Sequence, residues 1–134
     1  AGVCVAAKGL HEGIRIFAGE PAGADDAARS LAAGEIVENE STNTIADGLL
    51  TNLGQLTFPI IHEHVERVVT VSDAKIISAM RLMWERANLL IEPSAAVAVA
   101  AILRDEFKSL DGLEQVGVIL SGGNADLGRL PWTD

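Results

Sequence analysis

The sequence contains no tyrosine and a single cysteine, and only 4% of its 134 residues are aromatic. Alanine, valine, leucine and isoleucine must therefore fill most of the core. One cysteine cannot form an internal disulfide, so the fold cannot depend on disulfide bonds. Cys4 lies in a short apolar run, and we interpret it as a small buried hydrophobe. These features fit a reducing compartment, and we predict a cytoplasmic protein.

Positive charge is also scarce. The sequence has 10 lysine and arginine residues against 19 acidic residues, and its net charge is −9. Binding to nucleic acid or to an anionic membrane requires clustered positive charge, so we expect neither partner. The longest apolar run, residues 95–103, is far shorter than a membrane span. The chain begins without methionine directly in a helix-like segment, which leads us to expect a truncated sequence.

Strand-like and helix-like segments alternate along the chain. Apolar spacing and start and stop residues predict helices at 3–10, 24–33, 58–65, 73 to about 88, and 94–107. They predict strands at 14–19, 67–71 and 116–120. Residues 35–44 are expected to form an exposed loop, and residues 44–53 are ambiguous. This alternation predicts an α/β fold, a three-layer αβα arrangement around a mostly parallel sheet.

Ligands of such sheets bind outside the carboxyl ends of the strands. Three segments follow predicted strands directly: residues 20–26, Ser72-Asp73, and Ser-Gly-Gly-Asn at 121–124. In the last of these, two glycines after a hydroxyl let the backbone approach a flat or anionic ligand closely. Taken alone, this motif is explained as well by an ordinary strand-to-helix turn.

Three further segments accompany it: Ala-Gly-Glu-Pro at 18–21 with Ala-Asp-Asp at 24–26, Thr-Ile-Ala-Asp-Gly at 44–48, and Ile-Glu-Pro-Ser-Ala at 91–95. In order and spacing, the four segments resemble the C-terminal part of fold-type II pyridoxal-phosphate (PLP) enzymes. The most similar members are serine/threonine dehydratases (threonine ammonia-lyases) and serine racemase. The resemblance runs from residue 1 to about residue 132.

The resemblance implies that residues 1–134 form the C-terminal portion of the large PLP-binding domain of the tryptophan-synthase-β-like fold. It implies β-elimination and deamination of L-threonine or L-serine to a 2-oxo acid and ammonia. Racemisation of serine is the alternative within the same family. Which amino acid is preferred stays open. Family members are commonly homodimers, so we expect a homodimer here too.

The resemblance also assigns cofactor-binding residues. Ser121 corresponds to the family serine that hydrogen-bonds the pyridine nitrogen of PLP. A neutral hydroxyl leaves that nitrogen largely unprotonated and weakens the electron sink. Gly122 belongs to the same turn, and Asn124 either supports it or faces a nucleotide effector. Gly48 lies beside the cofactor ring, or is simply a turn residue. Glu92 orients the ring, or only complements the dipole of the helix that follows.

A divalent cation is implied at a separate place. The matching ligands are the carboxylates of Glu20 and Asp26 and the carbonyl of Ala24. An oxygen-only set completed by water fits Mg²⁺ or Ca²⁺. The alternative is that Asp25 and Asp26 merely begin a helix.

The lysine that holds PLP, the glycine-rich phosphate loop and the small substrate-binding domain have no counterpart in this sequence. Its three lysines, Lys8, Lys75 and Lys108, are predicted to be solvated surface charges, and its three histidines surface or structural residues. The chain therefore contains no catalytic residue of its own and needs the missing N-terminal part as a partner. An alternative of another class is a non-catalytic regulatory domain that binds a cation. A dinucleotide-binding domain is disfavoured, because no Gly-x-Gly-x-x-Gly follows a strand.

Overall fold

The computed structural model describes residues 1–133. Helices and strands alternate in the order α1 (Gly2–Leu10), β1 (Ile16–Pro21), α2 (Asp26–Ala33), the single 3₁₀ turn η1 (Asp47–Leu49), α3 (Phe58–His64), β2 (Val65–Val71), α4 (Asp73–Leu82), the π-helical turn η2 (Met83–Ala87), α5 (Pro93–Ile102) and α6 (Asp105–Lys108). The predicted α/β class is confirmed.

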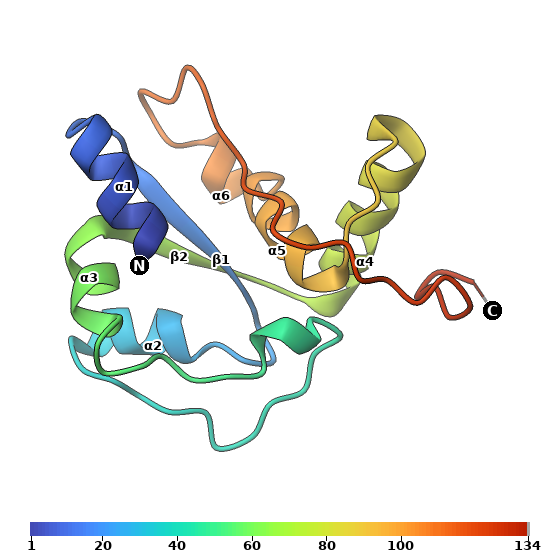
Figure 1. Cartoon of the computed structure of the whole chain (residues 1–134), viewed down its shortest axis with the longest axis horizontal. Helices are drawn as coiled ribbons and strands as arrows, with labels where there is room; N and C mark the ends of the chain where they lie inside the picture. The colour runs from blue at the N-terminus through green and yellow to red at the C-terminus, as the bar shows by residue number, and fades with distance from the viewer. Residues whose placement is uncertain (134) are drawn as a thin grey trace.

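The two strands form a parallel sheet in which Gly19 lies beside Val69 and Pro21 beside Val71. Helices lie on both faces of this sheet (Figure 1). On one face α5 packs against both strands, and α4 packs against α5. On the other side α2 packs against β2, and α1 packs against α3. The layers are therefore those expected from the sequence.

The alanine-rich helix α5 is the centre of the core, because six of its 10 residues are buried (Ala95, Ala96, Val97, Val99, Ala100 and Ala101). It crosses β1 at Gly19, where an added Cβ atom would lie 3.0 Å from the Val97 carbonyl oxygen. Small residues on both elements permit this close approach. Although α5 is strongly apolar, no helix within residues 1–133 is both long and apolar enough to cross a membrane.

Two predicted helices are not regular α-helix over their whole predicted length. The helix predicted from residue 73 to about 88 is regular to Leu82 and continues as a π-helical turn that Asn88 ends with a φ of 55°. The helix predicted over 94–107 is interrupted at Arg104, whose ψ of 143° is extended. The guanidinium of Arg104 donates to the Thr70 carbonyl at 2.8 Å, and this bond ties the break to β2.

The prediction of a strand at residues 116–120 is wrong for this chain. The segment lies beside α5, with Val118 and Leu120 packed against the core, but it belongs to no sheet. A strand is defined by hydrogen bonds to a neighbour. Within residues 1–133, no other backbone group is bonded to this segment. The segment has the apolar pattern of a strand, but within residues 1–133 no neighbouring strand pairs with it.

Candidate functional site

Ser121 follows the extended segment 116–120 and lies exposed near the amino end of α5. Its hydroxyl makes no hydrogen bond to any group within residues 1–133, so both its proton and its lone pairs are available. The cavity beside β1 ends at Ile119 and does not reach Ser121. The predicted contact residue therefore lies on an open face.

Glu92 holds the turn that follows Ser121. Its backbone N–H donates to the Gly122 carbonyl at 3.1 Å, and its carboxylate Oε2 accepts the Asn124 N–H at 2.8 Å. A Cβ atom added at Gly122 would lie 2.3 Å from the carboxyl carbon of Glu92, so the carboxylate occupies the space that a side chain would need. Glu92 is the residue before α5, but its side chain makes no capping hydrogen bond.

The structure brings four of the predicted cofactor residues together, since Ser121, Gly122, Asn124 and Glu92 share this turn. Gly48 reaches the first turn of α5 from the other side, because its N–H donates to Ser94 Oγ at 3.0 Å. An added Cβ atom at Gly48 would lie 2.9 Å from that oxygen. Gly48 and Glu92 therefore belong to one surface built around the amino end of α5.

Ser94 and Asp73 also shape this surface, and although both lie in segments noted in the sequence, neither was predicted to have a role in the site. Ser94 anchors Gly48, and Asp73 accepts hydrogen bonds from Thr44 and from Ile45, four and three residues before Gly48. A signal for Asp73 existed, because it follows the end of β2 directly, at the edge where ligands of parallel sheets bind.

The acidic residues form a separate group at the end of β1. Glu20, Ala24 and Asp26 are all buried. The carboxylate of Glu20 accepts the N–H groups of Ala27 and Ala28, each at 2.9 Å. Each carboxylate oxygen retains a second lone pair after one hydrogen bond, so these contacts leave capacity for a cation.

Asp26 is held by residues distant in sequence, since it accepts Asn39 Nδ2 at 2.9 Å and the Leu53 N–H at 2.7 Å. The predicted alternative, in which Asp26 merely begins a helix, is partly realised because it is the first residue of α2. Its carboxylate, however, also organises two loops.

Burial raises the pKa of Glu20 above its ordinary value, and the neighbouring charges of Asp26 and Asp25 raise it further, whereas the two amide hydrogen bonds oppose this shift. The nearby basic side chain, that of Arg29, forms an ion pair with Asp25 at 2.8 Å and not with the buried carboxylates of Glu20 and Asp26. Among residues 1–133 no site gathers three or more acidic, histidine or cysteine side chains. A cation here would be held by two carboxylates and one main-chain carbonyl.

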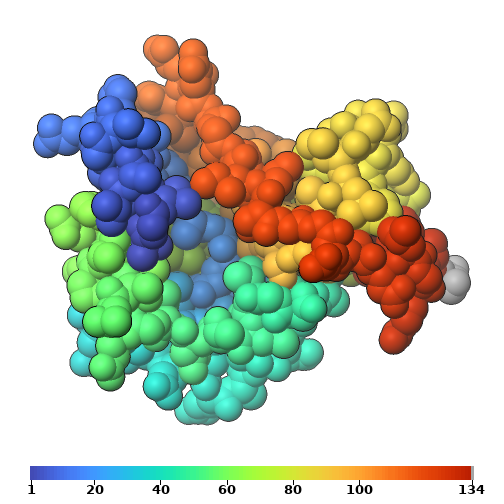
Figure 2. All heavy atoms as spheres, viewed as in Figure 1, coloured from blue at the N-terminus to red at the C-terminus, as the bar shows by residue number. Residues whose placement is uncertain are grey.

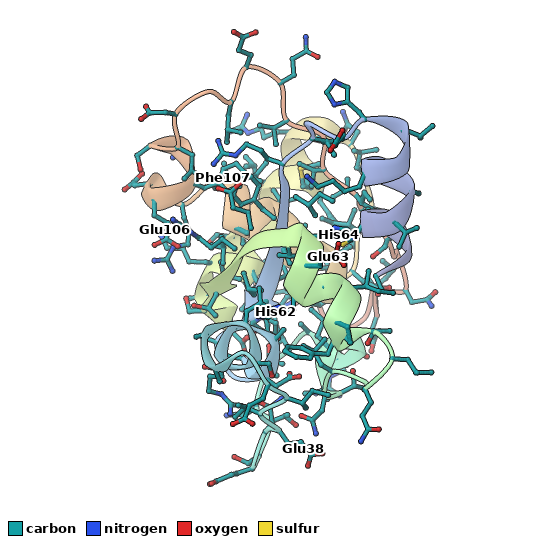
Figure 3. The ribbon with its side chains drawn as sticks, turned by 90° about the vertical axis from the view of Figure 1, so that its left-hand side faces the viewer. Glu38, His62, Glu63, His64, Glu106 and Phe107 are labelled. Atoms are coloured by element: carbon teal, nitrogen blue, oxygen red, sulfur yellow. The ribbon has the colours of Figure 1, made fainter. Side chains whose placement is uncertain are left out.

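The lysines and histidines lie apart from both groups. Lys75 and Lys108 are exposed, and the ammonium of Lys8 donates to the Glu12 carbonyl at 3.1 Å. Figure 3 shows His62 and His64 on the short helix α3, where His62 is exposed and His64 half-buried.

Comparison with known proteins places these geometries in context. The sequence profile of the pyridoxal-phosphate dependent enzyme family matches residues 1–122. The serine racemase of Dictyostelium discoideum is 51% identical over 131 residues, which is 96% of this chain and 40% of that protein. The chain thus spans about 40% of the length of these curated relatives.

Two solved structures have the same backbone arrangement. Maize serine racemase superposes with a TM-score of 0.90 at 48% identity, covering 95% of this chain and 40% of that one. A T.th. threonine deaminase superposes with a TM-score of 0.87 at 38% identity, covering 96% of this chain and 46% of that one.

Proposed function

Since the chain belongs to the family of pyridoxal-phosphate-dependent enzymes, we propose that it forms the C-terminal part of the cofactor-binding domain of a dehydratase. Its substrate would be L-threonine or L-serine, and its products a 2-oxo acid and ammonia. The chain spans only about 40% of its curated relatives, and we assign the whole reaction to an assembly with the remaining part. The resemblance to a threonine deaminase over nearly the whole chain supports this proposal.

The residues around the amino end of α5 fit the cofactor. Ser121 offers an unused hydroxyl, and its exposure leaves room for a flat ring against the turn. Gly122 and Gly48 adjoin this face, and a side chain at either position would collide with Glu92 or Ser94, which shape the face. Because the face is open, a complete pocket needs a second wall from residues outside this chain. PLP, when bound, supplies an electron sink for the negative charge that develops at Cα of the substrate.

In this proposal, the residues of the chain orient the ring and set the protonation of its nitrogen. Ser121 would donate a hydrogen bond to the pyridine nitrogen and stay neutral, so that nitrogen would remain unprotonated. Glu92 keeps the turn in place through its two hydrogen bonds to Gly122 and Asn124. A ring with an unprotonated nitrogen withdraws electrons weakly. It would favour a reaction in which the β-hydroxyl leaves as the α-proton is removed, because little negative charge then accumulates at Cα.

Serine racemisation is the second candidate, and the relatives favour it directly. The D. discoideum protein and the maize structure are both named serine racemase, at 51% and 48% identity. A neutral ring nitrogen also suits rapid return of the proton to Cα. The residue that would deliver the proton to the opposite face is expected outside this chain, so both reactions use the same residues here.

We further propose that Glu20, Asp26 and the Ala24 carbonyl hold Mg²⁺ or Ca²⁺ with water completing the shell. Two buried carboxylates without a paired basic side chain are costly. A hard cation with oxygen ligands would offset this cost.

Ser121 carries the cofactor proposal and provides its test. We define the chimera as D. discoideum serine racemase in which this chain replaces the matching 131-residue region. Ser121→Asp in the chimera is expected to protonate the ring nitrogen, shift the visible absorbance of the bound cofactor, and change the elimination-to-racemisation ratio by about 10-fold. Ser41→Asp, in the exposed loop, adds the same charge as a control. Identical spectra and ratios in all three proteins would refute the contact.

A further inference from the structure

The connection between α6 and the extended segment 116–120 is a largely exposed loop, residues 109–115, which forms the orange projection at the top of Figure 2. In this loop Asp111 is followed by Gly112, whose φ of 74° lies in the left-handed region that favours glycine. The main-chain nitrogen of a residue that follows aspartate can react with the aspartate carboxyl group. Glycine leaves this approach open, because it has no Cβ atom.

The surroundings of this pair do not hold the two reacting groups apart. Asp111 is exposed, and a Cβ atom added at Gly112 would meet no heavy atom within 4 Å. Within residues 1–133, neither the Asp111 carboxylate nor the Gly112 N–H takes part in a hydrogen bond. The side-chain carboxyl carbon and the next main-chain nitrogen are therefore free to approach each other.

The main-chain carbonyl of Asp111 is bound to a fixed positive charge. The Arg15 guanidinium donates from Nη1 to this carbonyl oxygen at 2.7 Å. Its Nε donates to Glu66 Oε2 at 2.7 Å, and this second bond holds the guanidinium in place. Because arginine is always protonated in proteins, the charge is permanent. A donor placed on a carbonyl oxygen stabilises the negative charge that develops there during a reaction.

We propose that Asp111–Gly112 is a site of spontaneous modification, at which Arg15 promotes the conversion of Asp111 to isoaspartate. The Gly112 nitrogen forms a bond to Cγ of the protonated Asp111 carboxyl group. The carboxyl hydroxyl leaves as water with the amide proton, and a cyclic succinimide remains. Water then adds to the main-chain carbonyl carbon of Asp111, the bond from this carbon to nitrogen breaks, and the nitrogen takes a proton. The main chain now runs through Cγ, and the overall composition is unchanged.

Arg15 acts in both steps, because both place negative charge on the oxygen that it binds. Before ring closure the Gly112 amide loses its proton, and the resulting charge is shared with the Asp111 carbonyl oxygen. During ring opening, water attacks the same carbonyl and the charge develops on the same oxygen. Attack there yields isoaspartate, whereas attack at Cγ restores aspartate. The position of the guanidinium therefore favours isoaspartate as the product.

The second Asp-Gly pair of the sequence, Asp47–Gly48, lies in surroundings that oppose the reaction. The Gly48 N–H donates to Ser94 Oγ at 3.0 Å and to the Asp47 carboxylate at 2.9 Å. The pair lies in the η1 turn, where the Asp47 carbonyl accepts the Leu50 N–H and binds no guanidinium. Ring closure there requires both hydrogen bonds of the nitrogen to break. This pair is therefore an internal control for the effect of Arg15.

The modification alters the connection that leads to the segment 116–120. Isoaspartate inserts an additional carbon into the main chain and turns the former carbonyl into a carboxylate beside Arg15. Val118 and Leu120 pack against the core, so the added length must be taken up by the loop before them. The inference does not depend on the proposed function, because the reaction uses only groups of this chain and water.

Incubation of the chimera in isotopically labelled water at neutral pH tests the inference. Mass spectrometry of the tryptic peptide 109–129 measures labelled isoaspartate and labelled aspartate, and a synthetic peptide of the same sequence is incubated in parallel. A fixed fold alone slows ring closure, because it restricts the rotation that the main chain needs. With Arg15 in place, we expect isoaspartate to form about 10-fold faster in the folded chimera than in the peptide. Equal or slower formation in the folded protein would overturn the inference, whether or not the chimera binds PLP.

An arginine variant isolates the effect of the charge. Arg15→Gln is expected to slow isoaspartate formation at Asp111 by about 10-fold, less than in a buried site because Arg15 is exposed and screened by salt. Arg81→Gln removes another exposed arginine, which binds Glu85 at 2.7 Å, and should leave the rate unchanged. Equal rates in the two variants would refute the role of Arg15. If Arg15→Gln does not fold, the comparison of the unaltered chimera with the peptide decides alone.

Discussion

Asp73, the first residue of α4, holds Thr44 and the residue after it through both carboxylate oxygens. The Thr44 hydroxyl donates to Asp73 Oδ1 at 2.6 Å, and the N–H of the next residue, Ile45, donates to Oδ2 at 3.1 Å. Thr44 Oγ1 also accepts the Ala46 N–H at 3.2 Å, and Ala46 is fully buried. The carboxylate thus fixes the segment that leads to Gly48.

Asp73→Ala is predicted to loosen this segment and weaken PLP binding by the chimera. Hydrogen bonds to a charged group contribute about 1.5–3 kcal/mol each, so the dissociation constant should rise by at least about 10-fold. Titration of the visible absorbance of the bound cofactor measures it. Ser78→Ala, which removes an exposed hydroxyl of the same helix that donates to Ala74, is the control. Equal affinities in the two variants would show that Asp73 does not position Gly48.

Gly122→Ala is predicted to disrupt the turn at Ser121. The new methyl group would lie 2.3 Å from the Glu92 carboxyl carbon, so the carboxylate must move and release the Asn124 amide. We expect PLP affinity to fall by about 10-fold or more, which corresponds to ~1.4 kcal/mol. Gly54→Ala serves as control, because its methyl group would make only an ordinary contact with Thr57. The idea fails if Gly122→Ala binds PLP like the unaltered chimera.

The cation proposal predicts that Mg²⁺ or Ca²⁺ raises the melting temperature and that Asp26→Asn abolishes this rise. At 100 times the dissociation constant, a bound ion stabilises by about 2.7 kcal/mol. Asp25→Asn is the matched control, because Asp25 precedes Asp26 but pairs with Arg29 at the surface. An undiminished thermal response in Asp26→Asn, or its loss in Asp25→Asn alone, would remove the assignment.

The Arg15–Glu66 pair gives a prediction about pH. The hydrogen bond from Arg15 holds the pKa of Glu66 below its ordinary value, and the charge of Arg15 acts in the same direction. A lowered folded-state pKa stabilises the fold above the unfolded-state pKa, about 4.3, and this contribution is lost as the pH falls through the folded-state value.

Glu66→Gln should therefore be less stable than the unaltered chain at pH 7, and the difference in urea unfolding should shrink as the pH falls below about 4.3. The difference should be small and should shrink with added salt, because both side chains are exposed. A difference in stability that does not shrink as the pH is lowered would mean that the pair contributes by packing and not by charge.

Local sequence patterns were sufficient for the elements that this chain completes by itself. The spacing of Ile76 and Met80 on α4 and the apolar run of α5 mark helices that bury those residues in one core. The parallel pairing of β1 and β2 follows from the helices between them. The turn at Ser121 and its neighbour Glu92 were also identified together, because their motifs occur in a recognisable order.

The remaining features depend on contacts that no local pattern encodes. The break at Arg104 coincides with a hydrogen bond to Thr70, 34 residues earlier. Ser94 matters because Gly48 reaches it from 46 residues away. Residues 116–120 have the composition of a strand, but strand formation requires a partner, and composition cannot show where that partner lies.

The close approach of α5 to β1 links the interior of the protein to its surface chemistry. Gly19 touches the middle of α5, and the amino end of the same helix carries Ser94 and follows Glu92. A methyl group at Gly19 would lie 3.0 Å from the Val97 carbonyl oxygen, so we expect α5 to shift and to carry Ser94 with it. A substitution at Gly19 is therefore expected to alter the surface around the amino end of α5, although Gly19 itself is not part of that surface.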